Sequence, residues 1–551
     1  MKYRSLAATI LLAFTTGFAQ HCRAQASEVK AILIPGLGNL QHPVTTTNPE
    51  AQRFFDQGLS LVYAFYHEGA SQSFRRAAEL DPSMAMAYWG IALAAGPNYN
   101  VPANAEGEKI AYENIQKALA LAPSAPEHER AYIGALAKRY TNASRPDYHA
   151  LDVAYRDAMR DLSRRFPDDL DAAVLYAESM MILHRWALWN RDGTPAEGTE
   201  EIVSVLESVL ARDPNHIGAV HYYVHAMEAS PYPGRALAAA NKLTSLAPGA
   251  GHLLHMPGHI FARTGLYDDA VSTNLNAASV DEPYARTPGV MGRVPMMSYR
   301  HDLEFIVYAA AMGGRYAVAK EAAKREAEFV ATHLNEMPQW EIHMAHTLTV
   351  LIRFERWQEI LNMPEPKPEL KFTSAIWHFA RGMALVSTGK VQEAESEQKI
   401  LTAIEAATPE DAIFRAPFNN KTKDMLKIAC RVLAAKIAAA RADNTQAILF
   451  FEQAIQIQDS LNYSEPPDWY YPVRESFGRL LLTTGDPKRA EQIFRVDLEK
   501  NPRNGRSLFG LAESLTAQGR RYDAELVMRQ FEDVWKDADV QLETSKVTVD
   551  K

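Results

Sequence analysis

Five histidines and one glutamate in the middle of the chain recur at helical spacing and could together bind a transition metal. They form two trios, which are His221, His225 and Glu228, and then His252, His255 and His259. At about 100° per residue, the members of each trio lie on one face of an α-helix. Imidazole and carboxylate groups are ligands of zinc, iron, copper, nickel and manganese. The trios therefore predict a metal-binding or proton-transfer site, provided that their helices face each other.

The elements that must position these residues show a repeat of 34 residues, which is typical of the tetratricopeptide (TPR) repeat. Gly58, Ala70 and Pro82 occupy repeat positions 8, 20 and 32 of an early copy. The same positions of a late copy are filled by Gly478, Ala490 and Pro502. Small residues let the two helices of a repeat pack closely, and the proline ends the second helix. We therefore predict an all-α fold, a right-handed α-solenoid of TPR-like helix pairs.

The same register places both trios on the first helices of consecutive repeats. Position 1 of one repeat is set at Ile217 and that of the next at Gly251, 34 residues later. Both trios then occupy positions 2, 5, 9 or 12, which line the concave groove in TPR proteins. His301, Glu304 and Tyr308 take positions 2, 5 and 9 of a further first helix. We expect His301 to join the metal ligands and Tyr308 to contact a ligand in the groove.

Three glutamates are candidates for a catalytic role near such a metal. Glu228, Glu178 and Glu304 could each bind the ion, orient an imidazole, or act as general base to a metal-bound water. The sequence leaves these roles open. Tyr470 and Arg474 form a second polar cluster, in which Arg474 could pair with a carboxylate of a bound ligand. The alternative for Arg474 is an ion pair within the chain.

The same pattern also permits readings without a metal. The groove could bind a small molecule or a peptide through polar contacts, or the histidines could serve only as structural hydrogen-bonding groups. A His-x-x-x-His spacing occurs by chance on many amphipathic helices. Pro257, between His255 and His259, either kinks one continuous helix or begins a new helix at its first turn.

The first residues of the chain have the pattern of a secretory signal peptide. Lys2 and Arg4 precede an apolar run at 6–18, and Ala24-Gln25-Ala26 forms a small-x-small cleavage site. The apolar run is short and interrupted by polar residues, so we expect no stable membrane span. We predict cleavage before Ser27 and a periplasmic or secreted protein.

Composition and charge constrain the partners of the chain. A content of 47% apolar and 23% charged residues is that of an ordinary globular protein. The net charge of −9 and the lack of a strong basic run give no surface for phosphate backbones, so we expect no nucleic-acid partner. We divide the chain into a signal peptide at 1–26, an irregular lead-in at 27–48, a TPR-like solenoid at 49–538 and a flexible tail at 539–551.

Several sequence blocks resemble those of a family of exported bacterial TPR proteins, over roughly residues 40–535. Besides the His-rich centre, the blocks are Ala51–Gly58, Met86–Gly90 and Trp469–Arg474. The resemblance implies an α-solenoid but no particular activity, because TPR repeats serve many unrelated tasks. The leading hypothesis is an exported protein whose concave groove binds a divalent transition metal (Zn, Fe, Cu, Ni or Mn) for hydrolytic or redox chemistry. The rival is a metal-free scaffold that binds a peptide or protein.

Overall fold

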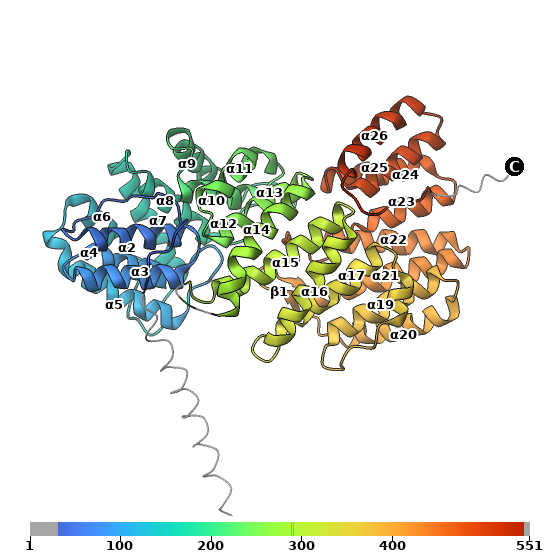
Figure 1. Cartoon of the computed structure of the whole chain (residues 1–551), viewed down its shortest axis with the longest axis horizontal. Helices are drawn as coiled ribbons and strands as arrows, with labels where there is room; N and C mark the ends of the chain where they lie inside the picture. The colour runs from blue at the N-terminus through green and yellow to red at the C-terminus, as the bar shows by residue number, and fades with distance from the viewer. Residues whose placement is uncertain (1–30, 288, 290, 545–551) are drawn as a thin grey trace, which may run out of the picture.

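The chain folds into a solenoid built almost entirely of helices (Figure 1). The computed structural model describes residues 31–287, 289 and 291–544. The signal peptide that we predict at 1–26 lies outside these residues. Within them, no helix has both the length and the apolar character needed to cross a membrane.

The first half of the solenoid runs from α2 to α15, which lies near the middle of Figure 1. Its helices pack mainly against their neighbours in the chain, as the repeat requires. They are α2 (Pro49–Tyr63), α3 (His67–Leu80), α4 (Ala85–Ala95), α5 (Ala105–Leu121), η1 (Ala122–Ser124), α6 (Glu127–Leu136), α7 (Tyr148–Arg165), α8 (Leu170–Leu183), α9 (Thr199–Arg212), α10 (Ile217–Glu228), η2 (Pro233–Ala236), α11 (Leu237–Leu246), α12 (Gly251–His255), α13 (Pro257–Arg263), α14 (Tyr267–Arg286) and α15 (Val294–Met312).

The second half continues the helix pairs and ends in α26, drawn in red in Figure 1. It contains α16 (Tyr316–His333), η3 (Pro338–Ala345), α17 (His346–Arg353), α18 (Trp357–Asn362), α19 (Lys371–Ser387), α20 (Val391–Ala407), β1 (Ile413–Arg415), β2 (Asn420–Lys421), α21 (Thr422–Ala440), α22 (Asn444–Asp459), α23 (Val473–Thr483), α24 (Pro487–Lys500), α25 (Gly505–Ala517) and α26 (Arg521–Val534). One apolar core joins the first half to α17, and a second core lies among α19 to α26.

The helix pairs follow the register that the sequence predicts. α10 begins at Ile217 and α12 at Gly251, the two residues at position 1 of their repeats. Close packing explains the small residues at position 8, because a Cβ atom on Gly58 would lie 2.6 Å from the Phe74 ring. α15 begins earlier than the repeat predicts, at Val294, and so carries extra turns before its groove-facing residues.

A short β-hairpin interrupts the solenoid where the sequence shows no strand pattern. β1 and β2 pair antiparallel between α20 and α21, and β1 lies beside α15 in Figure 1. The Phe418 ring of this hairpin lies 5.0 Å from the Trp186 ring, which belongs to the first half. The second half of the chain therefore closes over the helices that carry the histidines.

The described part of the lead-in, residues 31–48, lies against the first half. The backbone N–H of Ile34 donates to Gln57 at 2.7 Å, and Gly249 N–H donates to the Gly36 carbonyl at 2.8 Å. At the other end of the chain, the Asp539 carboxylate accepts hydrogen bonds from the first backbone N–H groups of α16. Both segments outside the repeats are thus attached to the solenoid where they are described.

A candidate metal centre of two imidazole triads

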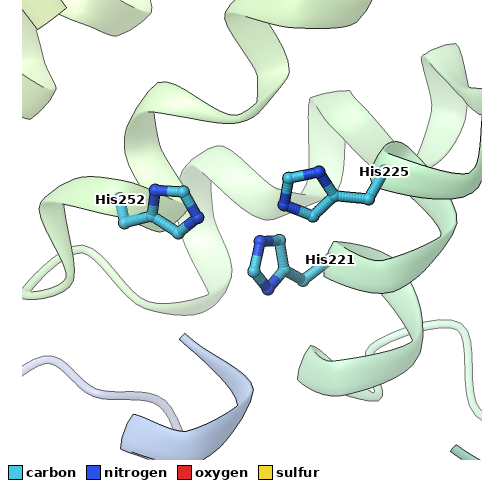
Figure 2. A group of neighbouring side chains, drawn as sticks. All are labelled: His221, His225 and His252. Atoms are coloured by element: carbon cyan, nitrogen blue, oxygen red, sulfur yellow. The ribbon is translucent and has the colours of Figure 1, made fainter. Parts of the chain in front are cut away.

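The histidines predicted to bind metal form two adjacent triads in the middle of the solenoid. His221 and His225 extend from α10 toward His252 of α12 (Figure 2). One ring nitrogen from each of these three residues lies within 4.8 Å of the other two. We name this group the first triad. Its members come from the first helices of two consecutive repeats, so the 34-residue register is what brings them together.

The hydrogen bonds behind the first triad fix which ring nitrogen is free. His221 Nδ1 donates to the Tyr63 carbonyl at 2.6 Å, and His225 Nδ1 donates to Glu228 Oε1 at 2.9 Å. A carbonyl oxygen only accepts, so the proton of His221 is on Nδ1 and the lone pair is on Nε2. The Nε2 atoms of all three rings have no hydrogen-bond partner among the described residues. His221 and His225 thus have the arrangement of metal-binding imidazoles, with Nδ1 facing an oxygen and Nε2 available to an ion.

The turn between α2 and α3 supplies a wall of the first triad that sequence reasoning missed. Phe65 in this turn has a φ of 61°, a left-handed conformation that is strained for a bulky residue. Its ring lies 4.7 Å from the His221 ring and 5.5 Å from the His225 ring. The same turn places the Tyr63 carbonyl that His221 needs. No sequence pattern marks Phe65, because its role depends on a single turn dihedral.

The second triad combines His255 of α12, His259 of α13 and His301 of α15. Every Nδ1 lies close to an oxygen, with the following partners and distances: His255 with Asn274 at 2.6 Å, His259 with Glu228 at 2.5 Å and Glu465 at 2.7 Å, and His301 with Glu304 at 3.1 Å. Burial lowers the pKa of His255 and of His259 to about 4. Both rings are therefore neutral near pH 7, which is the form that binds metals.

Glu228 joins the two triads. Its Oε1 atom faces His225 of the first triad and its Oε2 atom faces His259 of the second. The side chain is almost fully buried, and burial together with the nearby charge of Glu465 raises its pKa well above the usual value. Because its two oxygens face the Nδ1 atoms of His225 and His259, Glu228 lies behind both rings and away from their Nε2 atoms.

Pro257 lies between the α12 and α13 parts of the second triad. α12 ends at His255, and α13 begins with Pro257 at its first position. A proline costs nothing in hydrogen bonding at that position, because the first N–H groups of a helix have no partner within the helix. Of the two alternatives for Pro257, the start of a new helix is therefore the one observed.

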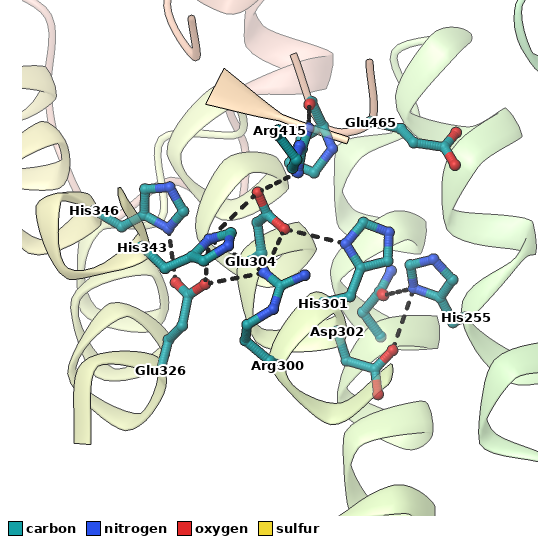
Figure 3. Close-up of polar contacts among 12 residues, drawn as sticks. His255, Arg300, His301, Asp302, Glu304, Glu326, His343, His346, Arg415 and Glu465 are labelled. Carbon is teal, nitrogen blue, oxygen red and sulfur yellow. Dashed lines mark hydrogen bonds and ion pairs between the residues drawn. The ribbon is translucent and has the colours of Figure 1, made fainter. Parts of the chain in front are cut away.

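A second cluster of buried histidines and carboxylates lies beside the second triad (Figure 3). We name it the ion network, and its members are Arg300, Glu304, Glu326, His343, His346 and Arg415. Arg300 and Arg415 approach the two oxygens of Glu304 at 2.8 and 2.7 Å. Burial alone would raise the pKa of Glu304, but these two guanidinium groups outweigh it and hold that pKa well below the usual value. The carboxylates of this cluster are thus neutralised by the chain itself.

The remaining candidates occupy different surroundings. Glu178 is buried away from the imidazoles, near Arg139, and its burial raises its pKa to about 7 although Arg139 opposes the shift. Tyr470 lies at the ion network, with its hydroxyl 3.3 Å from His346 Nδ1. The Tyr308 ring lies 5.9 Å from that of Tyr470.

Arg474 does not face a ligand site. Its two terminal nitrogens lie 2.9 and 2.5 Å from the carboxylate oxygens of Asp459 on α22. Such a bidentate pair uses the geometry that would otherwise bind a ligand carboxylate. The structure contains the ion pair within the chain that is the alternative for Arg474, so a bound carboxylate would have to compete with Asp459.

Sequence reasoning also missed Glu465 and Arg415. Glu465 Oε2 lies 2.7 Å from His259 Nδ1, and Arg415 bonds to Glu304, the partner of His301. Arg415 is the last residue of β1 and Glu465 lies in an irregular segment of the second half, so both are outside the repeat pattern. Nothing in their spacing connects them to helices more than a hundred residues earlier in the chain.

The comparisons with known proteins identify no family for this chain. No family model matches the sequence, and no curated protein is similar to it. A solved structure of the human IFIT1 dimer with m7Gppp-AAAA is 10% identical over 90% of this chain and 96% of that chain, with a TM-score of 0.32. The APC/C hetero-tetramer Cut9–Hcn1 is 12% identical over 89% of this chain and 94% of that chain, with a TM-score of 0.29. We draw nothing about the site from likenesses this distant.

Proposed function

We propose that this protein is an exported, TPR-like protein that binds a divalent transition metal ion inside its solenoid. One observation carries the proposal: three Nε2 atoms without hydrogen-bond partners converge in the first triad. A buried imidazole nitrogen without a hydrogen-bond partner destabilises the folded state, and the first triad contains three such atoms close together. A metal ion at about 2.0–2.1 Å from each nitrogen would satisfy all three together.

The ligand chemistry favours copper or zinc among the metals that the sequence allows. Each triad offers imidazole nitrogens, and the carboxylates nearest the rings are directed at Nδ1 atoms. Iron(II) sites commonly include a carboxylate ligand, and manganese prefers oxygen donors, whereas imidazole suits zinc and copper. A bound ion would supply Lewis acidity, or electron transfer if it is copper.

The candidate glutamates take different roles in this proposal. Glu228 orients His225 and His259, and Glu304 orients His301, as partners of the Nδ1 atoms. Glu178 takes no part, because its charged neighbours are Arg139, Asp152 and Arg185 instead of the imidazoles. His252 and His301 are the most exposed members of the two triads, so a substrate would approach the ions from their side.

Metal analysis of protein purified without a polyhistidine tag tests the proposal. We expect at least about one transition metal ion per chain, and a clear loss of bound metal in His225→Gln. His378→Gln is a matched control, because His378 is also buried and bonds to Glu397 at 2.6 Å on α20, outside both triads. A wild-type protein that remains metal-free after dialysis against zinc and against copper contradicts the proposal.

A second candidate function rests on a cavity in the second half. This cavity has a volume of about 500 Å³, within the range of sites that hold small molecules or short peptides. Its lining combines apolar and charged side chains, including Phe379, Trp469, Tyr471, Arg353 and Arg506. Peptide-array or small-molecule binding that is lost in Trp469→Ala, while metal content is unchanged, supports this function as separate from the metal centre.

Export is part of the proposal and has its own test. We expect the mature protein to begin at Ser27 when the full chain is produced in a bacterium with a secretory pathway. Mass spectrometry of the intact protein from the periplasmic fraction measures this directly. Full-length protein retained in the cytoplasm contradicts export.

A further inference from the structure

We infer that the centre holds two metal ions, one in each triad, and that Glu228 supports both sites. The inference deepens the proposed function and rests on it. The proposed function needs only the first triad, so the two ideas make different predictions for the number of bound ions.

The second triad has the arrangement of ligands and supporting oxygens that the first has. The Asn274 amide is oriented by its Nδ2 donating to the Ala270 carbonyl at 2.7 Å, so its Oδ1 faces His255 and accepts from Nδ1. His301 Nδ1 donates to Glu304, whose charge is held by Arg300 and Arg415. Oxygen acceptors therefore keep the protons of these rings on Nδ1 and turn the Nε2 lone pairs to the other side.

The short contact between His255 and His259 points to a cation. Their Nε2 atoms lie 2.6 Å apart, and the Nδ1 atom of each ring faces an oxygen. With both protons on Nδ1, two lone pairs would face each other across this distance. A hydrogen bond between the two Nε2 atoms requires a proton on one of them, which for His259 means that Glu228 or Glu465 donates a proton to its Nδ1. An ion bound by both nitrogens needs no proton on either Nε2 and would move the two atoms apart, because two ligands of one tetrahedral ion lie about 3.3 Å apart.

A single ion cannot serve both triads. Within the described residues, the candidate ligand groups contain the two triads separately and none combines members of both. Two atoms that are each 2.0–2.1 Å from one ion lie at most about 4.2 Å apart, so a shared site would have appeared as one group within the 4.8 Å limit. Rings of the two triads are neighbours, with centroids 6.0 Å apart for His252 and His255, and 6.2 Å apart for His225 and His259. The triads are nevertheless close enough for two ions to interact.

The carboxyl groups around the triads are numerous enough to support two ions. Six imidazoles are neutral ligands, so the charge of each buried ion would have to be balanced by nearby carboxyl groups that are ionised when the ion is bound. Glu228 and Glu465 meet at His259, Asp302 lies 3.2 Å from His255 Nδ1, and Glu304 lies behind His301. Glu228 is the only one of these four that also contacts the first triad. We therefore expect it to influence both ions.

Copper(II) loading tests the inference. Metal-free protein is incubated with copper(II), passed through a desalting column, and analysed for copper per chain and by electron paramagnetic resonance. We expect about two coppers per chain and a spectrum altered by spin coupling, with less integrated signal than the copper content. This measurement needs no variant.

Variants of each triad then separate the two sites. We expect about one copper per chain, with the spectrum of an isolated ion, in His221→Gln/His225→Gln and equally in His255→Gln/His301→Gln. His378→Gln should retain two coppers. Circular dichroism establishes whether each variant is folded. If a variant is not folded, the copper content and spectrum of the wild type decide whether two ions are bound.

The outcomes distinguish this inference from the proposed function. One copper per wild-type chain, with the spectrum of an isolated ion, overturns the inference and leaves the proposed function intact. The absence of bound copper and zinc in the wild type overturns both.

Discussion

The metal centre and the ion network contain the same kinds of side chain but differ in which atoms face inward. In the metal centre the carboxylate of Glu228 lies behind the imidazoles, and the Nε2 atoms of the first triad face one another without partners. In the ion network the carboxylates of Glu304 and Glu326 lie at the middle, surrounded by guanidinium and imidazole groups. The first arrangement is the one in which we propose a cation from outside, whereas the second already contains its cations.

The difference shows why a count of histidines and carboxylates cannot identify a metal site. Glu304, His343 and His346 also have ligand atoms within 4.8 Å of one another, as a metal site requires. Arg300 and Arg415 occupy the oxygens of Glu304, so an added ion would compete with two fixed positive charges. The arginines, which sequence patterns for metal sites ignore, decide between the two functions.

The largest expected effect comes from breaking the ion network. Glu326 is fully buried, and its carboxylate lies 2.7 Å from His346 and 3.8 Å from Arg300. Glu326→Ala leaves buried positive charge uncompensated, so we expect a loss of about 3–5 kcal/mol in the free energy of unfolding, measured by denaturant titration. Metal content should stay at the wild-type level. Glu328→Ala, at an exposed position of the same helix, is the control and should change stability by less than about 0.5 kcal/mol.

The metal centre should behave in the opposite way, with stability that depends on added ions. At a free metal concentration about a hundred times the dissociation constant, binding stabilises the folded chain by about 2.7 kcal/mol. We expect this as a rise in melting temperature with zinc or copper, reversed by a chelator. His225→Gln should show a smaller rise and Glu326→Ala should keep the full rise. A metal response that Glu326→Ala abolishes would show that the ion network, not the triads, binds the metal.

Much of this comparison could be predicted from the sequence, because it follows from periodicity. The 34-residue register fixes where α10 and α12 begin, and hence which faces of these helices meet. His301 could be added because α15 obeys the same register at its groove-facing positions. Residues at equivalent positions of consecutive repeats lie close together because the repeats of a solenoid stack in the same way.

The rest depends on segments without any period. Phe65 lies in a tight turn, Glu465 in an irregular segment and Arg415 at the end of β1. The last two reach the centre only because the second half closes over it. The sequence leaves open whether Arg474 pairs with a ligand or within the chain, because its partner Asp459, on a different helix, is not apparent from spacing. Contacts of this kind are set by tertiary packing, which a single sequence read by pattern does not contain.

A smaller effect should follow from Glu228→Gln, which tests the link between the triads. An amide has one oxygen, so it can accept from His225 or from His259 but presents an N–H₂ group to the other. Loss of such a supporting oxygen typically weakens metal binding by about 10–100-fold, and we expect that reduction in zinc affinity by competition with a chromophoric chelator. Glu207→Gln is the control, since Glu207 is half-exposed on α9 and bonds to Tyr223 and Arg235. Equal affinities in the two variants would mean that Glu228 does not support the ions.

A third buried histidine–carboxylate contact gives the smallest effect, and it should depend on pH and not on metal. His42 Nδ1 lies 2.7 Å from Asp171 Oδ2 and ties the lead-in to α8. Burial alone would lower the pKa of His42, but the hydrogen bond to Asp171 and the charges of Asp171, Asp169 and Asp56 outweigh it and raise that pKa above 6.5.

A pKa that is higher in the folded than in the unfolded chain means that protonated His42 stabilises the fold. This contribution is complete below about pH 6.5 and is lost as the pH rises through the folded pKa of His42. We therefore expect the wild type to exceed His42→Gln in melting temperature at low pH, and the difference to shrink above pH 6.5, with a chelator present throughout. A difference that stays constant from pH 5 to pH 9 would show that His42 is neutral in this contact. His42 would then resemble the imidazoles of the metal centre in charge, and its contact with Asp171 would be only a neutral hydrogen bond.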